Sequence, residues 1–145
     1  MIAHAIEIER PAGRVFDFVS TPALWHRWHP ATRSVREVPE RPLTRGEHMV
    51  EQIAAAGRHF DARWVVEVCE APAVWVISTD TPRGGARKRY RITPLGASAC
   101  RFERSLDFHS KGWFWRALDG SVTRWVLMRQ SARALRNLKR VLEAA

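Results

Sequence analysis

The last third of the chain carries a helical apolar period that is long for 145 residues. Apolar side chains recur every three or four positions, the spacing of one face of an amphipathic helix. We expect this helix to begin near Trp113 and to run almost to the C-terminus. At about 1.5 Å per residue it would be roughly 40 Å long, so it must lie along a whole sheet. The stripe comprises Leu118, Val122, Trp125, Met128, Ala132, Leu135, Leu138 and Leu142.

The residues before this helix alternate in polarity with the two-residue period of β-strands. The first such segment is Ile2–Glu9. Two short helices are predicted next, one with Pro11 in its first turn and one capped by Thr21 that ends before Pro30. Later strands are predicted at Arg33–Val38, Glu47–Ala55, His59–Cys69, Ala73–Thr79, Arg87–Thr93 and Ala99–His109, with a loop at 80–85.

The predicted order is one strand, two short helices, a run of antiparallel strands and one long helix. An antiparallel sheet needs one face covered, and the C-terminal helix alone is long enough to cover it. We therefore predict an α+β fold in a single domain over residues 1–145. In it, a curved antiparallel sheet of about seven strands wraps around the C-terminal helix, with an apolar cavity between them.

The pleat of each strand assigns side chains to the two faces of this sheet. A turn at 56–57 sets Ile53, Glu51 and Met49 opposite Phe60, Ala62 and Trp64. The side chains predicted to face the helix are Phe60, Ala62, Trp64, Val66, Val68, Trp75, Ile77, Tyr90, Ile92, Phe102, Arg104, Leu106 and Phe108. The arginines Arg87, Arg89 and Arg91 alternate with the inward set and form a solvated face.

Two charged residues, Glu51 and Arg104, fall on the inward face. A lone buried charge is costly, so each should have a partner. One reading is a mutual or local ion pair. The other is that Arg104, with Tyr90, fixes the polar or acidic head of an otherwise apolar ligand, because such sites combine apolar walls with a few convergent polar groups.

The mouth of the cavity is expected near the second short helix, the 80–85 loop and the start of the long helix. These segments carry Trp25, Trp28 and His29, and the three successive aromatics at 113–115. Three consecutive aromatics cannot all face one core, so Trp113–Trp115 either closes the junction of sheet and helix or is partly exposed at the entrance, in a dimer contact or against a membrane.

The net charge of +9 suggests a polyanion partner, but its distribution argues against one. Three of the 24 basic residues are lysines and the other 21 are arginines, scattered from Arg10 to Arg140. Cys69 and Cys100 lack metal or redox spacing and are read as free thiols in a reducing compartment. No leader pattern or membrane span is recognised, so we expect a cytoplasmic location.

Common catalytic and cofactor motifs such as GxSxG, HExxH and GxGxxG are absent from the sequence. His26 and His29 could share a helix face, but no third ligand completes a zinc site nearby, so no metal and no cofactor is expected. Acid–base groups that could act in the cavity are His29, His48, Glu51 and Tyr90. None of them forms a recognisable catalytic triad.

Several segments together resemble a known family. They are Ile6–Ile8, Pro11–Val19, Leu24–Pro30, the turn Thr93–Gly96 and the C-terminal Leu135–Glu143. In that order they resemble the START-like, or SRPBCC, superfamily of helix-grip proteins, of the polyketide cyclase/dehydrase and lipid transport type. The resemblance covers essentially the whole chain and implies the helix-grip fold. It implies no single chemistry, because one fold hosts many functions.

Three functions are compatible with these features. The first is binding of a hydrophobic or amphiphilic small molecule, such as a lipid or an aromatic or polyketide-like compound. The second is a cyclase/dehydratase-type enzyme that uses an acid–base group in the same cavity. The third is a protein-partner module, like the co-chaperone or toxin branches of the superfamily. The residues expected to contact a ligand are Trp28, His29, Glu51, Trp64, Trp75, Tyr90, Phe102, Arg104, Trp113 and Trp125.

The outer sheet face is expected to be apolar near Val65, Cys69, Val74 and Val76. An exposed apolar patch on a sheet favours self-association. We therefore expect a homodimer contact there.

Overall fold

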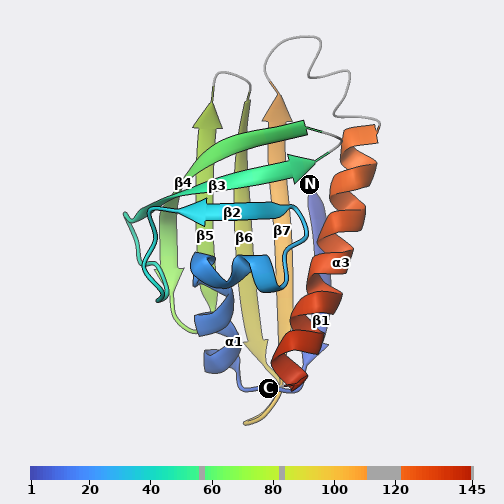
Figure 1. The fold of residues 1–145 in the computed structure, drawn as a ribbon. Helices are drawn as coiled ribbons and strands as arrows, with labels where there is room; N and C mark the ends of the chain where they lie inside the picture. The colour runs from blue at the N-terminus through green and yellow to red at the C-terminus, as the bar shows by residue number, and fades with distance from the viewer. Residues whose placement is uncertain (56–57, 82–83, 111–121, 145) are drawn as a thin grey trace.

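The structure, a computed structural model, describes residues 1–55, 58–81, 84–110 and 122–144. Within these ranges, one strand, two short helices, six more strands and a long helix follow in sequence order (Figure 1). Their bounds are β1 Ile2–Ile8, α1 Ala12–Val19, the 3-10 helix η1 Pro22–Arg27, β2 Thr32–Arg36, β3 His48–Ala55, β4 Arg58–Glu70, β5 Val74–Thr81, β6 Gly84–Pro94, β7 Cys100–Ser110 and α3 Val122–Ala144.

The seven strands form one antiparallel sheet in the order β1-β7-β6-β5-β4-β3-β2. The first strand pairs with the last, so β1 and β2 occupy opposite edges although the chain joins them directly through α1 and η1. Figure 1 shows the sheet curling so that β2 and β3 cross in front of β5, β6 and β7, with η1 packed next to β2. The predicted helix-grip architecture is confirmed.

The register across the β3–β4 hairpin agrees with the pleat analysis. Met49 pairs with Trp64, and Glu51 with Ala62. Alternate side chains of the sheet are therefore buried against α1, η1 and α3, as the two-residue period requires. The buried set includes Met49, Ala62, Trp64, Val66, Trp75, Ile77, Tyr90, Ile92, Phe102 and Leu106.

A β-bulge in β4 changes the faces predicted for two residues. Val66 pairs with Ile77, but the next pair is Val68 with Val76, so Glu67 is the extra residue. One inserted residue reverses the alternation beyond it. Cys69 therefore packs against the core instead of the outer face. The predicted inward position of Val68 and the outward position of Cys69 are both wrong.

The hairpin between β5 and β6 is tighter than predicted. β5 runs to Thr81 and β6 begins at Gly84, so most of the predicted 80–85 loop belongs to strands. Asp80 pairs with Gly85 in this ladder. Gly84 and Gly85 at the start of β6 have no side chains that would hinder pairing with the end of β5. The start expected for the long helix near Trp113 lies outside the described residues.

Helix α3 packs chiefly along β1, with smaller contacts to β3 and η1. Its buried stripe comprises Ser131, Ala134, Leu135, Leu138 and Leu142. Trp125 and Met128, predicted to belong to the apolar stripe, are instead 57% and 43% exposed. With about 100° between successive residues, the stripe through Leu138 turns Trp125 toward solvent. This part of the predicted stripe is wrong.

The two sides of α3 should therefore differ in their contribution to stability. We expect Leu138→Ala, at a position that is 0% exposed, to lower the free energy of unfolding by about 2–5 kcal/mol, because it leaves a cavity against the sheet. Met128→Ala should change it by less than about 1 kcal/mol. Urea denaturation of both variants measures the difference. Equal losses would contradict this placement of the helix.

Candidate functional site

Buried aromatic rings fill the space between the sheet and η1. Trp25, Trp28, Trp75, Tyr90 and Phe102 are each at most 1% exposed. Tyr90 stacks on Trp75 with ring centroids 5.5 Å apart and meets Phe102 edge-on at 5.3 Å. Trp28 meets Phe102 at 6.4 Å and Tyr90 at 6.0 Å. These offset and edge-on pairs add stability beyond the area that they bury.

Three of the buried indoles donate to fixed acceptors. Trp25 Nε1 donates to the Val19 carbonyl at 2.9 Å, and Trp75 Nε1 donates to the Leu43 carbonyl at 2.9 Å. Trp64 Nε1 donates to Glu51 Oε1 at 3.0 Å. Buried N–H groups that find such partners cost little and hold their rings in one orientation. Trp28 Nε1 makes no such bond with any described residue.

A buried chain of polar side chains crosses this aromatic interior. Glu51 Oε2 accepts from the Thr32 hydroxyl at 2.5 Å, and that hydroxyl lies 3.1 Å from His29 Nδ1. On the other side of the ring, His29 Nε2 lies 2.7 Å from Arg104 Nη2, and Arg104 Nη1 donates to Ser131 Oγ at 2.7 Å. This chain of hydrogen bonds thus joins β3, β2, His29 after η1, β7 and α3.

The ends of this chain fix the direction of every hydrogen bond in it. A guanidinium only donates, so His29 Nε2 must accept from Arg104. The imidazole proton is then on Nδ1 and is donated to the Thr32 oxygen, which in turn donates to the Glu51 carboxylate. Burial, followed by the charges of Arg104 and Lys88, holds the pKa of His29 well below its ordinary 6.5. The neutral ring that this direction requires is therefore the favoured form.

Lys88 is a third buried charge, and the sequence analysis missed it. Its side chain is 3% exposed, and Nζ lies 4.8 Å from the Trp25 ring centroid and 4.9 Å from that of Trp64. Burial lowers the pKa of Lys88 to about 8, against the opposing attraction of Glu51. The alternation that placed Tyr90 and Ile92 inward also places Lys88 inward. The prediction of a solvated face for Arg87, Arg89 and Arg91 holds for these arginines and leaves Lys88 between them on the inward side.

The interior therefore holds two cations, Lys88 and Arg104, and one carboxylate, Glu51. Burying an ionised group costs several kcal/mol unless a charge or hydrogen bond compensates it. With His29 neutral, one positive charge is left over. The potential at the centre of the site is positive and favours an anion or a developing negative charge.

Three hydrogen-bond donors in the same cluster have no partner among the described residues. They are Trp28 Nε1, Tyr90 Oη and Arg104 Nε, and each is buried. Tyr90 and Arg104 are cross-strand neighbours on β6 and β7. Burial raises the pKa of the Tyr90 hydroxyl, so it remains a donor at neutral pH, although the charge of Arg104 and the approach of its guanidinium to the hydroxyl oxygen as a donor oppose this shift. Such an arrangement lacks an acceptor, which an oxygen atom of a bound molecule could supply.

The structure brings eight of the ten predicted ligand contacts into or beside this interior. They are Trp28, His29, Glu51, Trp64, Trp75, Tyr90, Phe102 and Arg104. Glu51 and Arg104 do not pair with each other, because Thr32 and His29 lie between them. Trp125 lies on the exposed side of α3, and Trp113 is outside the described residues. Of the acid–base candidates, His48 is exposed.

Two surface depressions are lined by described residues, and neither is lined by the buried aromatic rings. One of about 560 Å³ lies across β5, β6 and β7 near Ser78, Arg87 and Asp107. The other, of about 430 Å³, lies over β1, β6 and β7 and is bordered by Arg89 and Arg91. The predicted apolar cavity stays a prediction, and most of the residues expected to line it lie in the aromatic interior.

Among the described residues, no group of three or more His, Cys, Asp or Glu side chains could hold a metal ion. None of the described helices α1, η1 and α3 combines the length and apolarity that a bilayer-spanning segment needs.

The lowered pKa of Lys88 makes a prediction about stability. Between about pH 8 and the ordinary 10.5, the native lysine has lost its proton while the unfolded chain still holds it. Stability contributed by this residue therefore rises with pH across that window. Relative to Lys88→Met, we expect the free energy of unfolding to rise by about 3 kcal/mol. Denaturant titrations of both proteins at several pH values would show a constant difference if the lysine had an ordinary pKa.

Comparisons with known proteins agree with this fold. The family model described as polyketide cyclase / dehydrase and lipid transport matches residues 2–143. A search of curated sequences gave no match. Among solved structures, the Zhui aromatase/cyclase from Streptomyces sp. R1128 superposes with a TM-score of 0.76 at 17% identity, over 98% of this chain and 92% of that one.

Two other solved structures have similar scores. A START superfamily protein from Mycobacterium smegmatis gives a TM-score of 0.70 at 15% identity, covering 99% of this chain and 94% of that one. Norcoclaurine synthase from Thalictrum flavum gives 0.66 at 16% identity, covering 99% and 87%. At these identities the likeness shows the shared fold. With the family match along almost its whole length, the chain belongs to the polyketide cyclase / dehydrase and lipid transport family of START-like, helix-grip proteins.

Proposed function

We propose that the aromatic interior binds an apolar, preferably aromatic, small molecule through an oxygen atom. The observation that carries this proposal is the cluster of unpartnered buried donors, Trp28 Nε1, Tyr90 Oη and Arg104 Nε. Leaving a buried donor without an acceptor costs about 1–3 kcal/mol each. A carbonyl, enolate or carboxylate oxygen would satisfy several of them at once, while the rest of the ligand contacts the rings of Trp75 and Phe102.

The charge of the site favours an anionic oxygen over a neutral one. Arg104 and Lys88 outnumber Glu51, so a carboxylate or enolate would balance the interior. A hydrogen bond to a charged group contributes about 1.5–3 kcal/mol, roughly twice a neutral one. The similar norcoclaurine synthase structure contains dopamine and hydroxybenzaldehyde, which are oxygen-bearing aromatic rings bound by that protein.

A cyclase/dehydratase-type activity is the second candidate, and Lys88 is the observation that favours it. An enzyme that forms and quenches an enolate needs donors for its oxygen and a group that exchanges a proton near neutral pH. The donor cluster supplies the first, and the pKa of about 8 suits Lys88 for the second. His29 is less suited, because both of its ring nitrogens already lie within hydrogen-bond distance of Thr32 and Arg104.

Binding of 2-naphthoate and of its neutral analogue 2-naphthamide tests the binding proposal. We expect Tyr90→Phe to weaken naphthoate binding about 5- to 10-fold, the effect of one hydrogen bond. Stability should be unchanged or higher, because no described residue accepts a hydrogen bond from the Tyr90 hydroxyl. Arg104→Leu should weaken naphthoate roughly 10- to 100-fold and naphthamide less. Isothermal titration calorimetry measures the affinities, and urea denaturation measures the stability.

Trp125→Phe is the control, since this exposed side chain lies away from the interior and should leave both affinities unchanged. Equal losses of the two ligands in Arg104→Leu would show that Arg104 is structural. Unchanged naphthoate affinity in Tyr90→Phe would show that the Tyr90 hydroxyl does not bind the ligand and would contradict the proposed role of the donor cluster. If wild-type protein binds neither probe, the proposed ligand class is wrong.

A further inference from the structure

One tryptophan differs from the other described tryptophans in its surroundings. Trp25, Trp28, Trp64 and Trp75 are at most 2% exposed, whereas Trp125 on α3 is 57% exposed. Met128, one turn further along the same helix, is 43% exposed. Residues three apart on a helix are neighbours on its surface, so these two form a small apolar patch. Neither packs in the core that the stripe through Leu138 forms.

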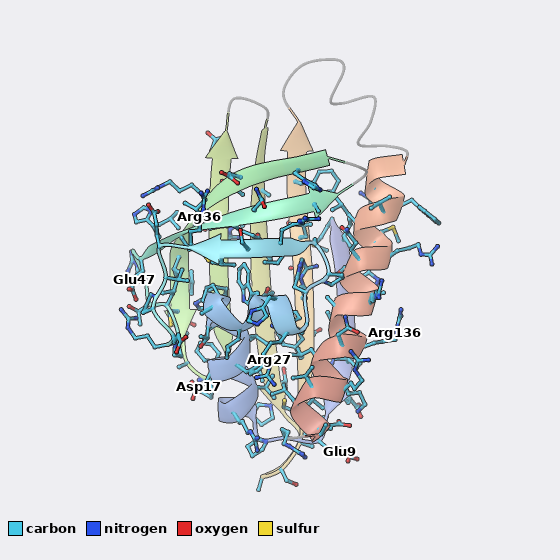
Figure 2. The ribbon with its side chains drawn as sticks, viewed as in Figure 1. Glu9, Asp17, Arg27, Arg36, Glu47 and Arg136 are labelled. Carbon is cyan, nitrogen blue, oxygen red and sulfur yellow. The ribbon has the colours of Figure 1, made fainter. Side chains whose placement is uncertain are left out.

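The same side of α3 carries an excess of positive charge. Residues Val122–Ala144 include six basic side chains and one acidic one, so this helix holds +5 of the chain's net charge of +9. Arg129, Arg133, Arg136 and Arg140 are all exposed. Figure 2 shows Arg136 projecting from α3 away from the sheet.

The arginines of this surface lack acidic partners among the described residues. The single acid of the helix, Glu143, binds Lys139 and the Glu9 amide at the far end of α3. Arg129 lies over the Trp125 ring, 4.9 Å from its centroid, and Arg140 donates to the Asn137 side chain. The charge of this surface is therefore not neutralised within the described part of the molecule.

We propose that the surface formed by Trp125, Met128, Arg129, Arg133 and Arg136 docks the protein peripherally on anionic lipid membranes. Tryptophan with arginine is the pairing that suits the boundary between lipid headgroups and acyl chains, where the ring is half-immersed and the guanidinium meets phosphate. A helix exposed along one side can lie flat in that boundary.

The combination favours a membrane over a nucleic acid. Phosphate-binding surfaces for nucleic acids rely on cations, and aromatic rings there serve to stack bases. Here the ring is already covered on one side by Arg129, and its neighbour Met128 is a flexible apolar side chain. Two apolar side chains beside unneutralised arginines match the surface of an anionic membrane, where apolar acyl chains lie beneath negatively charged headgroups. This proposal is independent of what the aromatic interior binds.

Vesicle co-sedimentation tests the proposal with the full chain. Wild-type protein should partition onto phosphatidylcholine vesicles containing 30% phosphatidylglycerol at low salt, and weakly onto pure phosphatidylcholine. Arg129→Gln/Arg133→Gln/Arg136→Gln should reduce that partitioning on the order of tenfold or more, because each cation near an anionic surface contributes to binding. Trp125→Ala should reduce it severalfold even though it leaves the net charge unchanged.

The matched control is Arg33→Gln/Arg89→Gln/Arg91→Gln, which removes the same charge from exposed positions on β2 and β6. It should lower partitioning less than about threefold. Circular dichroism confirms that each variant is folded. An equal loss in the control would show attraction by net charge alone and would overturn the proposal. So would the absence of binding by wild-type protein, no effect of Trp125→Ala, or tighter binding of an RNA or DNA fragment that the α3 variants abolish.

Discussion

The hydrogen-bond chain from Glu51 through Thr32 and His29 to Arg104 is the constraint on which the interior depends. It connects an acid on β3 to a guanidinium on β7, on opposite sides of the curled sheet, and continues to Ser131 on α3. Each charged end would be costly to bury by itself. Joined through a neutral imidazole, the two ends are compensated without direct contact. The chain also fixes where Arg104 points, and so which of its nitrogens remains without a partner.

The aromatic rings and the charges have complementary roles in this interior. Trp25, Trp64 and Trp75 are held by hydrogen bonds to fixed acceptors and form rigid walls. Trp28 and Tyr90, with Arg104, present donors that no described residue accepts. A core selected for stability alone would bury fewer such groups, because each unmet donor destabilises the fold. Their concentration in one cluster is the physical reason to regard the interior as a binding site.

Much of the fold could be predicted from sequence because strand alternation and helix period are strong signals. The pleat placed Glu51, Tyr90 and Arg104 inside, and the turn predicted at 56–57 led to the β3–β4 register that the structure has. The partners of the charges could not be predicted in the same way. His29 meets Arg104 only through the curl of the sheet, which brings residues 75 positions apart within hydrogen-bond distance.

Local irregularities account for the remaining errors. The bulge at Glu67 leaves no mark in the alternation of valines around it, so the faces of Val68 and Cys69 were reversed. On α3, an apolar period continued through Trp125 and Met128, although the buried stripe excludes both. A period shows that a helix is amphipathic, but it does not fix which side of the helix faces the sheet. Lys88 was a different kind of error, because the alternation that predicted its neighbours applied equally to it.

A crystal structure of the protein with 2-naphthoate bound tests the central claim most directly. We predict that the naphthalene ring lies within the aromatic interior. A carboxylate oxygen should lie about 2.7–3.2 Å from at least two of Trp28 Nε1, Tyr90 Oη and Arg104 Nε. The His29–Thr32–Glu51 bonds should be retained. Naphthoate bound only at the protein surface, with the same three donors meeting protein acceptors or water alone, would contradict it.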